Sequence, residues 1–231
     1  MSRGERKMQS EAVTYIGFVQ DHSGSMNSKK QLAVDNFNEQ RAKLLKEDDD
    51  TMDNLVTIVE FDDDIHCNYD NVPINETKEL SEWWTGGMTA LYDAIAFCIN
   101  NVKVKMKADS RENKAALIVI QTDGAENNSS DYEGEEGRIA INKLINELED
   151  TKLWSFVFLG ENIDETIAMS MGFKMANIMS HKSGHDNIQH AYNMSSEGLD
   201  TYMKGRKRGE TQTMNFYNSA GDSAKNDNDN Q

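Results

Sequence analysis

The stretch that decides the fold reads Val13-Thr14-Tyr15-Ile16-Gly17-Phe18-Val19-Gln20-Asp21-His22-Ser23-Gly24-Ser25-Met26. Its first half is apolar, β-branched and aromatic, which is typical of a buried strand, and its second half is small and polar, which is typical of a loop. In α/β sheets, ligands bind where strands end in such loops. Asp21, Ser23 and Ser25 stand at alternate positions, and oxygen ligands of this kind suit Mg2+. An ordinary turn is the alternative interpretation, because Ser and Gly are common in turns.

Composition favours a single sizeable domain inside the cell. The chain has 231 residues, 37% of them hydrophobic, and no apolar run near the roughly 20 residues of a membrane span. A net charge of -16 argues against a nucleic-acid partner, because such partners require a basic face. Cys67 and Cys98 form no disulfide or metal pattern, and the polar N-terminus resembles no signal peptide. We therefore expect a cytoplasmic protein that does not contact membranes.

Apolar patterns alternate between strands and helices along the chain. Strands are predicted at 13–19, 55–61, 65–69, 115–120 and 153–159, and helices at 28–46, 91–102, 141–148, 163–171 and 188–199. Alternation over this length indicates a doubly wound α/β fold, with a mostly parallel central sheet, one antiparallel edge strand and helices on both faces. The turn Asp62-Asp63-Asp64 is short enough for a hairpin and lacks the spaced ligands of a calcium loop.

A second carboxylate, Asp123, stands at the end of another buried strand. If the strands that end at Asp21 and Asp123 are parallel, both carboxylates lie at one edge of the sheet, where they favour a cation or a raised pKa. Between them the chain reads Gly86-Gly87-Met88-Thr89 and leads into a helix. Taken alone, this turn suggests an ordinary N-cap at Thr85 or Thr89.

Together these motifs resemble a von Willebrand factor A (VWA) domain with a metal-ion-dependent adhesion site (MIDAS). The resemblance spans about residues 12–180 and rests on Asp21-x-Ser23-x-Ser25, the stretch Gly86 to Ala94, and Thr122-Asp123-Gly124, in that order. The stretch Phe156 to Gly160 is similar to stand-alone bacterial and phage members. Met88 is a departure, because many members have glycine or proline before the threonine. A Rossmann-like VWA fold is what the resemblance implies.

The resemblance also implies one metal site and its ligands. Ser23 and Ser25 would coordinate a divalent cation through their hydroxyls, Thr89 would do so directly or through water, and Asp21 and Asp123 would bind directly or hold coordinating waters. The expected ion is Mg2+, with Mn2+ or Ca2+ as alternatives. Neutral hydroxyl ligands leave much of the ion's charge available, so a carboxylate from a partner protein would complete the coordination shell.

The leading functional hypothesis is therefore a metal-dependent protein-binding module. It is not expected to be an enzyme, because no nucleophile–histidine pair or general base is evident near the site. One alternative is a metal-dependent phosphohydrolase with Asp21 as nucleophile, although haloacid-dehalogenase-like phosphatases have a second Asp where this chain has Ser23. Another is a self-assembling structural subunit whose metal contacts a neighbouring copy. The acidic segment 128–137, predicted to be a mobile loop, favours a partner with basic residues around its carboxylate.

The predicted boundaries are an N-terminal extension at 1–11, the VWA domain with a C-terminal helix at 12–204, and a disordered tail at 205–231. The last residues lack large apolar side chains, and such segments do not offset the entropy of ordering. The basic run 204–208 would then be an exposed part of the tail. His22, Trp83 and Trp84 are candidates for partner contact, with at least one tryptophan expected to pack in the core.

Overall fold

The computed structural model describes residues 10–217, which fold around a six-stranded sheet of order β3-β2-β1-β4-β5-β6. The strands are β1 Ala12–Asp21, β2 Met52–Phe61, β3 Ile65–Pro73, β4 Asn113–Thr122, β5 Trp154–Glu161 and β6 Ile178–His181. Within this part of the chain every strand pair is parallel except β2 with the edge strand β3. The predicted fold class, a mostly parallel sheet with one antiparallel edge strand, is confirmed.

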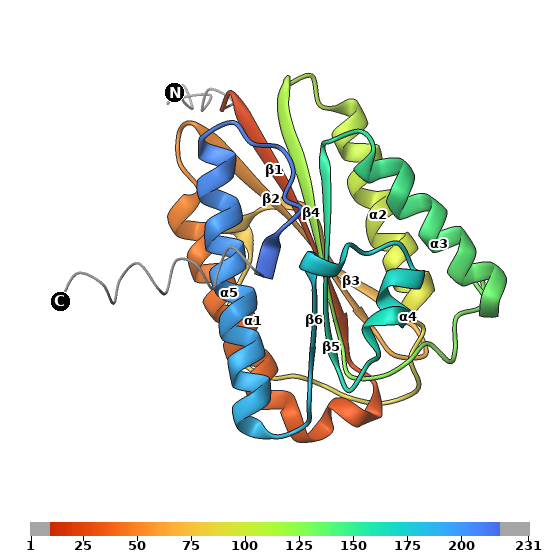
Figure 1. Cartoon of the computed structure of the whole chain (residues 1–231). Helices are drawn as coiled ribbons and strands as arrows, with labels where there is room; N and C mark the ends of the chain where they lie inside the picture. The colour runs from red at the N-terminus through yellow and green to blue at the C-terminus, as the bar shows by residue number, and fades with distance from the viewer. Residues whose placement is uncertain (1–9, 218–231) are drawn as a thin grey trace, which may run out of the picture.

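Helices cover both faces of the sheet. They are α1 Lys30–Glu47, α2 Leu91–Ala108, α3 Gly134–Glu149, α4 Glu165–Ser170 and α5 His185–Lys207, with short 3-10 helices η1 Gly24–Lys29, η2 Ile74–Glu76 and η3 Met175–Asn177. Figure 1 shows α1 and α5 on one side and α2, α3 and α4 on the other. β1 and β5 are consequently buried along their whole length, as the continuous apolar runs predict. None of the helices in residues 10–217 combines the length and apolarity required to cross a bilayer.

Alternate side chains of the central strands β1, β4 and β5 fill a core on each side of the sheet. From β1, Val13, Tyr15 and Val19 pack against α2, while Ile16 and Phe18 face α1 and α5. Gly17 lies on the α2 side, where an added Cβ would stand 2.5 Å from the Cys98 sulfur. A glycine inside this strand therefore lets α2 approach the sheet closely.

The segment 128–137 is held in place, so the prediction of a mobile loop is corrected. Its last four residues belong to the start of α3. The Asp93 carboxylate on α2 accepts hydrogen bonds from the backbone N–H groups of Ser130, Asp131 and Tyr132, at 2.7, 3.2 and 2.8 Å. The Asp93 carboxylate thus satisfies three backbone donors, an arrangement that acidic composition alone does not reveal.

The C-terminal prediction is wrong for residues 205–217, which pack against the domain. α5 runs to Lys207, and Phe216 and Tyr217 are buried in the core on the α1–α5 side. Two aromatic residues supply the apolar burial that orders this segment. The predicted extension at residues 1–9 and the predicted tail at residues 218–231 lie outside the described residues.

Arg206 is a buried anchor and not the exposed basic residue that the run 204–208 suggests. Its side chain is 1% exposed. Its guanidinium donates to the Val13 carbonyl at 3.1 Å, to Thr14 Oγ1 at 3.0 Å and to Asn113 Oδ1 at 2.9 Å. These acceptors lie on β1 and β4, so the hydrogen bonds of Arg206 link α5 to the centre of the sheet.

Candidate metal centre

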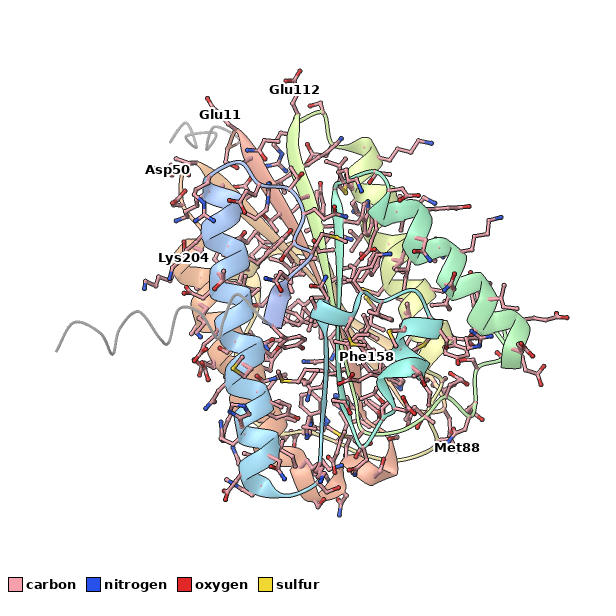
Figure 2. The ribbon with its side chains drawn as sticks, in the orientation of Figure 1. Glu11, Asp50, Met88, Glu112, Phe158 and Lys204 are labelled. Atoms are coloured by element: carbon pink, nitrogen blue, oxygen red, sulfur yellow. The ribbon has the colours of Figure 1, made fainter. Side chains whose placement is uncertain are left out.

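The five predicted ligands come from three segments that meet at one edge of the sheet. β1 ends at Asp21 and β4 ends at Thr122, and the two strands are parallel neighbours. Their carboxyl ends therefore open on the same side, as the sequence predicts. Figure 2 labels Glu11 and Glu112 at the opposite end, before β1 and β4, and labels Met88 at the end where the candidate site lies.

Hydroxyl groups connect the two carboxylates. Ser25 Oγ donates to Asp123 Oδ1 at 2.6 Å, and Ser23 Oγ and Ser25 Oγ are 3.0 Å apart. The Ser23 backbone N–H donates to Asp21 Oδ1 at 2.7 Å, and the Thr122 hydroxyl donates to Asp21 Oδ2 at 2.5 Å. The structure thus brings Asp21, Ser23, Ser25 and Asp123 into one hydrogen-bonded group.

Asp21 is buried at this position, and its environment favours a nearby cation. Its side chain is 0% exposed. Burial raises the pKa of Asp21, although the hydrogen bonds from Ser23 and Thr122 work in the opposite direction. A positive charge beside the carboxylate would stabilise its ionised form.

The acidic turn after β2 fixes the loop that carries Thr89. Asp63 Oδ1 accepts the Met88 backbone N–H at 2.8 Å. Gly87 has a φ of 61°, and an added Cβ would lie 2.6 Å from Asp63 Oδ2, so this position requires glycine. The turn does more than connect two strands, and Thr89 is not an N-cap, because Ala90 takes that position with no side-chain cap.

Thr89 lies against the loop that follows β4. Its backbone N–H donates to Asn127 Oδ1 at 2.9 Å, and the Asn127 backbone N–H donates to the Thr89 carbonyl at 3.1 Å. A Cβ added to Gly124 would be 3.3 Å from Thr89 Oγ1. The Thr89 hydroxyl therefore stands beside the residue that follows Asp123, and all five predicted residues lie at one edge.

Lys29 and Glu161 complete the group, and the sequence analysis missed both. Lys29 is the last residue of η1, and its ammonium forms ion pairs with Asp123 and with Glu161, the latter at 2.7 Å. Thr122 pairs with Gly160 in the sheet, so Asp123 and Glu161 follow at adjacent positions. Burial alone would lower the pKa of Lys29, but hydrogen bonds to the two carboxylates raise it, so the residue stays cationic. The sequence does hold a signal for Glu161, because it is a carboxylate at the end of β5, a parallel strand that ends at the same edge of the sheet as β1 and β4.

His22 and Trp83 are structural residues, whereas Trp84 reaches the surface. The His22 ring is fully buried and stacks on Trp83 with 4.1 Å between ring centroids. Burial lowers the pKa of His22 to about 4, so the ring is neutral at physiological pH. Trp83 is buried as well, while Trp84 is 38% exposed and its indole N–H donates to Glu60 at 2.8 Å. The expectation that at least one tryptophan packs in the core is confirmed, and of these three residues only Trp84 is exposed.

The donor set suits a hard cation. It consists of oxygen atoms from two carboxylates and three hydroxyls. Mg2+ and Ca2+ prefer such oxygen ligands, whereas softer metals prefer nitrogen or sulfur ligands. Within residues 10–217, no three side chains among His, Cys, Asp and Glu come together as a metal site. The serine and threonine hydroxyls are therefore essential to this candidate centre.

Comparisons with known proteins bear on the fold. No protein-family model and no curated protein match the sequence. Three solved structures show what the chain is similar to. The PilB minor pilin from Streptococcus sanguinis has a TM-score of 0.57 at 12% identity, over 85% of this chain and 63% of the pilin. Proximal thread matrix protein 1 from the mussel byssus, with a zinc-occupied MIDAS motif, has a TM-score of 0.55 at 13% identity, over 83% and 46%. The SpRpn10 VWA domain has a TM-score of 0.53 at 10% identity, over 80% and 95%.

The chain spans less than half of the length of the mussel protein and almost all of the SpRpn10 domain. At these identities the similarity concerns the fold. Within residues 10–217, the mostly parallel sheet with one antiparallel edge strand and the helices on both faces agree with it. The chain therefore has the Rossmann-like α/β fold of a von Willebrand factor A domain.

Proposed function

We propose that the chain is a metal-dependent protein-binding module. Asp21, Ser23, Ser25, Thr89 and Asp123 would hold a divalent cation, and a carboxylate of a partner protein would complete its shell. The observation that carries this proposal is the hydrogen bond from Ser25 to Asp123, which joins the loops after β1 and β4 within an all-oxygen group. The zinc-occupied MIDAS motif of the mussel protein supports a divalent ion on this fold. Mg2+ is the proposed ion, with Mn2+ or Ca2+ as alternatives.

The residues of the site favour binding over catalysis. When bound, the cation supplies positive charge and an open ligand position. Ser23, Ser25 and Thr89 contribute neutral oxygens, which leave that charge available to an incoming anion. Both carboxylate oxygens of Asp21 accept hydrogen bonds, from the Ser23 backbone N–H and the Thr122 hydroxyl, and the side chain is buried. Asp21 therefore orients the loop after β1 and is poorly placed as a nucleophile. This geometry disfavours the phosphohydrolase alternative.

The surface next to the site suggests the charge of the partner. A pocket of about 310 Å³ lies beside the Thr89 loop, and its charged lining residues are Asp63, Asp64, Asp93 and Asp131. A partner that offers only acidic groups would be repelled here. We therefore propose a partner whose carboxylate reaches the metal, while its Lys or Arg residues contact these four aspartates and speed association. Trp84 and the exposed Met88 offer apolar contact nearby. A second copy of the chain remains an alternative source of the carboxylate.

A displayed library of random peptides tests the carboxylate requirement. The chain is immobilised, peptides are bound in Mg2+, and the retained peptides are eluted with chelator. We expect them to share an Asp or Glu with Lys or Arg nearby, and we expect the Ser23→Ala/Ser25→Ala variant to retain none of them. Ser28→Ala is the matched control, because Ser28 is an exposed serine of the same 3-10 helix outside the group. Equal retention in chelator, or retained peptides without a carboxylate, would overturn the proposal.

A further inference from the structure

Lys29 stands where the metal site and a further carboxylate meet. Its ammonium contacts Oδ2 of Asp123 and Oε2 of Glu161, and the side chains of both acids are almost fully buried, at 2% and 7% exposure. Oδ1 of Asp123 already accepts the Ser25 hydroxyl. Both oxygens of this proposed metal ligand therefore have partners within the chain.

The position of Glu161 explains why a lysine is needed. Asp123 and Glu161 follow paired positions of β4 and β5, so two like charges lie side by side in a buried setting. Such a pair is unfavourable unless a cation lies between the carboxylates. Lys29 supplies that cation from η1, the 3-10 helix that continues the Ser23–Ser25 loop.

A divalent ion on Asp123 would face the same ammonium group at close range. Two cations that share one carboxylate repel each other strongly at low effective dielectric. Lys29 keeps a second partner in Glu161, and a cavity of about 10 Å³, lined in part by Lys29 and Glu161, leaves room for a small shift of the ammonium.

We propose that Lys29 competes with the divalent cation for Asp123, and that Glu161 makes metal binding possible by holding Lys29 when the cation takes Asp123. This inference rests on the proposed function and deepens it, because it names the residues that set the metal affinity of the same site. Lys29 and Glu161 act through Asp123 and are positioning residues, not ligands.

The test is a titration with Mn2+, in which electron paramagnetic resonance measures the free ion. We expect Lys29→Met to bind Mn2+ about tenfold more tightly than the unmodified chain, and Glu161→Gln to bind about tenfold more weakly. Lys29→Gln removes the charge but keeps a donor for Asp123, and it replaces Lys29→Met if that variant does not fold. Lys30→Met is the matched control, because Lys30 has no ion-pair partner among the described residues. Removing this neighbouring charge, which forms no ion pair with Asp123 or Glu161, should change the Kd by about twofold at most.

The double variant Lys29→Met/Glu161→Gln separates competition from a general charge effect. If Glu161 acts by holding Lys29, then Glu161→Gln should weaken Mn2+ binding much less in the Lys29→Met background than in the unmodified chain. Equal weakening in both backgrounds would overturn the inference. A Lys29→Met variant that binds Mn2+ no more tightly than Lys30→Met would overturn it as well. In either case, if Ser23→Ala/Ser25→Ala loses Mn2+ binding, the proposed function still stands. Absence of Mn2+ binding in every variant would overturn both.

Discussion

Ser25 and Asp123 are 98 positions apart in the sequence and are joined by a hydrogen bond of 2.6 Å between Ser25 Oγ and Asp123 Oδ1. The bond forms because β1 and β4 are parallel neighbours whose loops leave the sheet side by side. A second bond, from the Thr122 hydroxyl to Asp21 Oδ2, crosses between the same strands in the opposite direction. The two loops therefore behave as one unit, in which a change to one loop alters the other.

We predict that the chain does not hydrolyse phosphomonoesters. Asp21 is buried with both oxygens hydrogen-bonded, and Ser23 stands where an acid–base carboxylate would be required. A chromogenic phosphomonoester incubated with the chain and Mg2+ should be turned over no faster than in buffer. Metal-dependent turnover that disappears in Asp21→Asn would contradict this prediction and restore the enzyme hypothesis.

Asp109 should make the stability of the fold depend on pH. Burial alone would raise its pKa, but hydrogen bonds from Arg111 and the Tyr15 hydroxyl lower it to about 2. Because the folded-state pKa lies below the unfolded value, the carboxylate stabilises the fold above that unfolded value and loses this effect as pH falls toward 2. The contribution near neutral pH is about 2 kcal/mol.

Urea unfolding of the unmodified chain and Asp109→Asn at several pH values measures this contribution. The difference in unfolding free energy should be about 2 kcal/mol near neutral pH and should shrink as the medium is acidified. A difference that stays constant with pH would show that Asp109 stabilises the fold by some other means.

Arg206→Met should destabilise the fold by about 3 kcal/mol, because it leaves the Val13 carbonyl, Thr14 and Asn113 without their charged donor in a buried setting. Arg208→Met is the control. Its guanidinium pairs with Glu210 at the surface, so its loss should cost less than about 1 kcal/mol. Similar losses for both variants in urea unfolding would mean that Arg206 contributes as an ordinary surface residue does.

Gly198→Ala should also destabilise the chain, although alanine favours a helix by about 1 kcal/mol over glycine. An added Cβ at Gly198 would collide with the ring of Phe216. The net loss in the free energy of unfolding, measured by thermal unfolding, should therefore be on the order of 1 kcal/mol. Adding Phe216→Leu to this variant should recover part of the loss, because leucine leaves more space beside α5. A more stable Gly198→Ala variant would contradict the observed packing of residues 205–217.

Strands β1 to β5, and the meeting of Asp21 with Asp123 at one edge of the sheet, could be predicted for a physical reason. Strands buried on both faces form continuous apolar runs, so β1 and β4 stand out in the sequence. Parallel strands share a carboxyl edge, which places Asp21 and Asp123 together without further information. The resemblance to VWA domains then added Thr89, whose position depends on a glycine loop fixed by Asp63.

Other residues could not be placed because their roles depend on contacts between distant segments. Lys29 reaches Asp123 only because η1 turns the chain back over the ends of β4 and β5. Arg206 looks solvated within a basic run. Only the fold shows that its guanidinium donates hydrogen bonds to carbonyl and side-chain oxygens of β1 and β4. β6 has four residues, of which one is buried, too short a pattern to stand out from a loop.

Whether the five residues form one cation site is tested most directly by calorimetric titration of Mg2+ into the unmodified chain and into Ser23→Ala/Ser25→Ala. We predict that the unmodified chain and Ser28→Ala bind a single ion and that the double variant binds none. At a hundredfold excess over its Kd, the ion should add about 2.7 kcal/mol to the free energy of unfolding and raise the Tm accordingly. No Mg2+ binding by the unmodified chain, or equal binding by the double variant, would contradict a metal centre built from these residues.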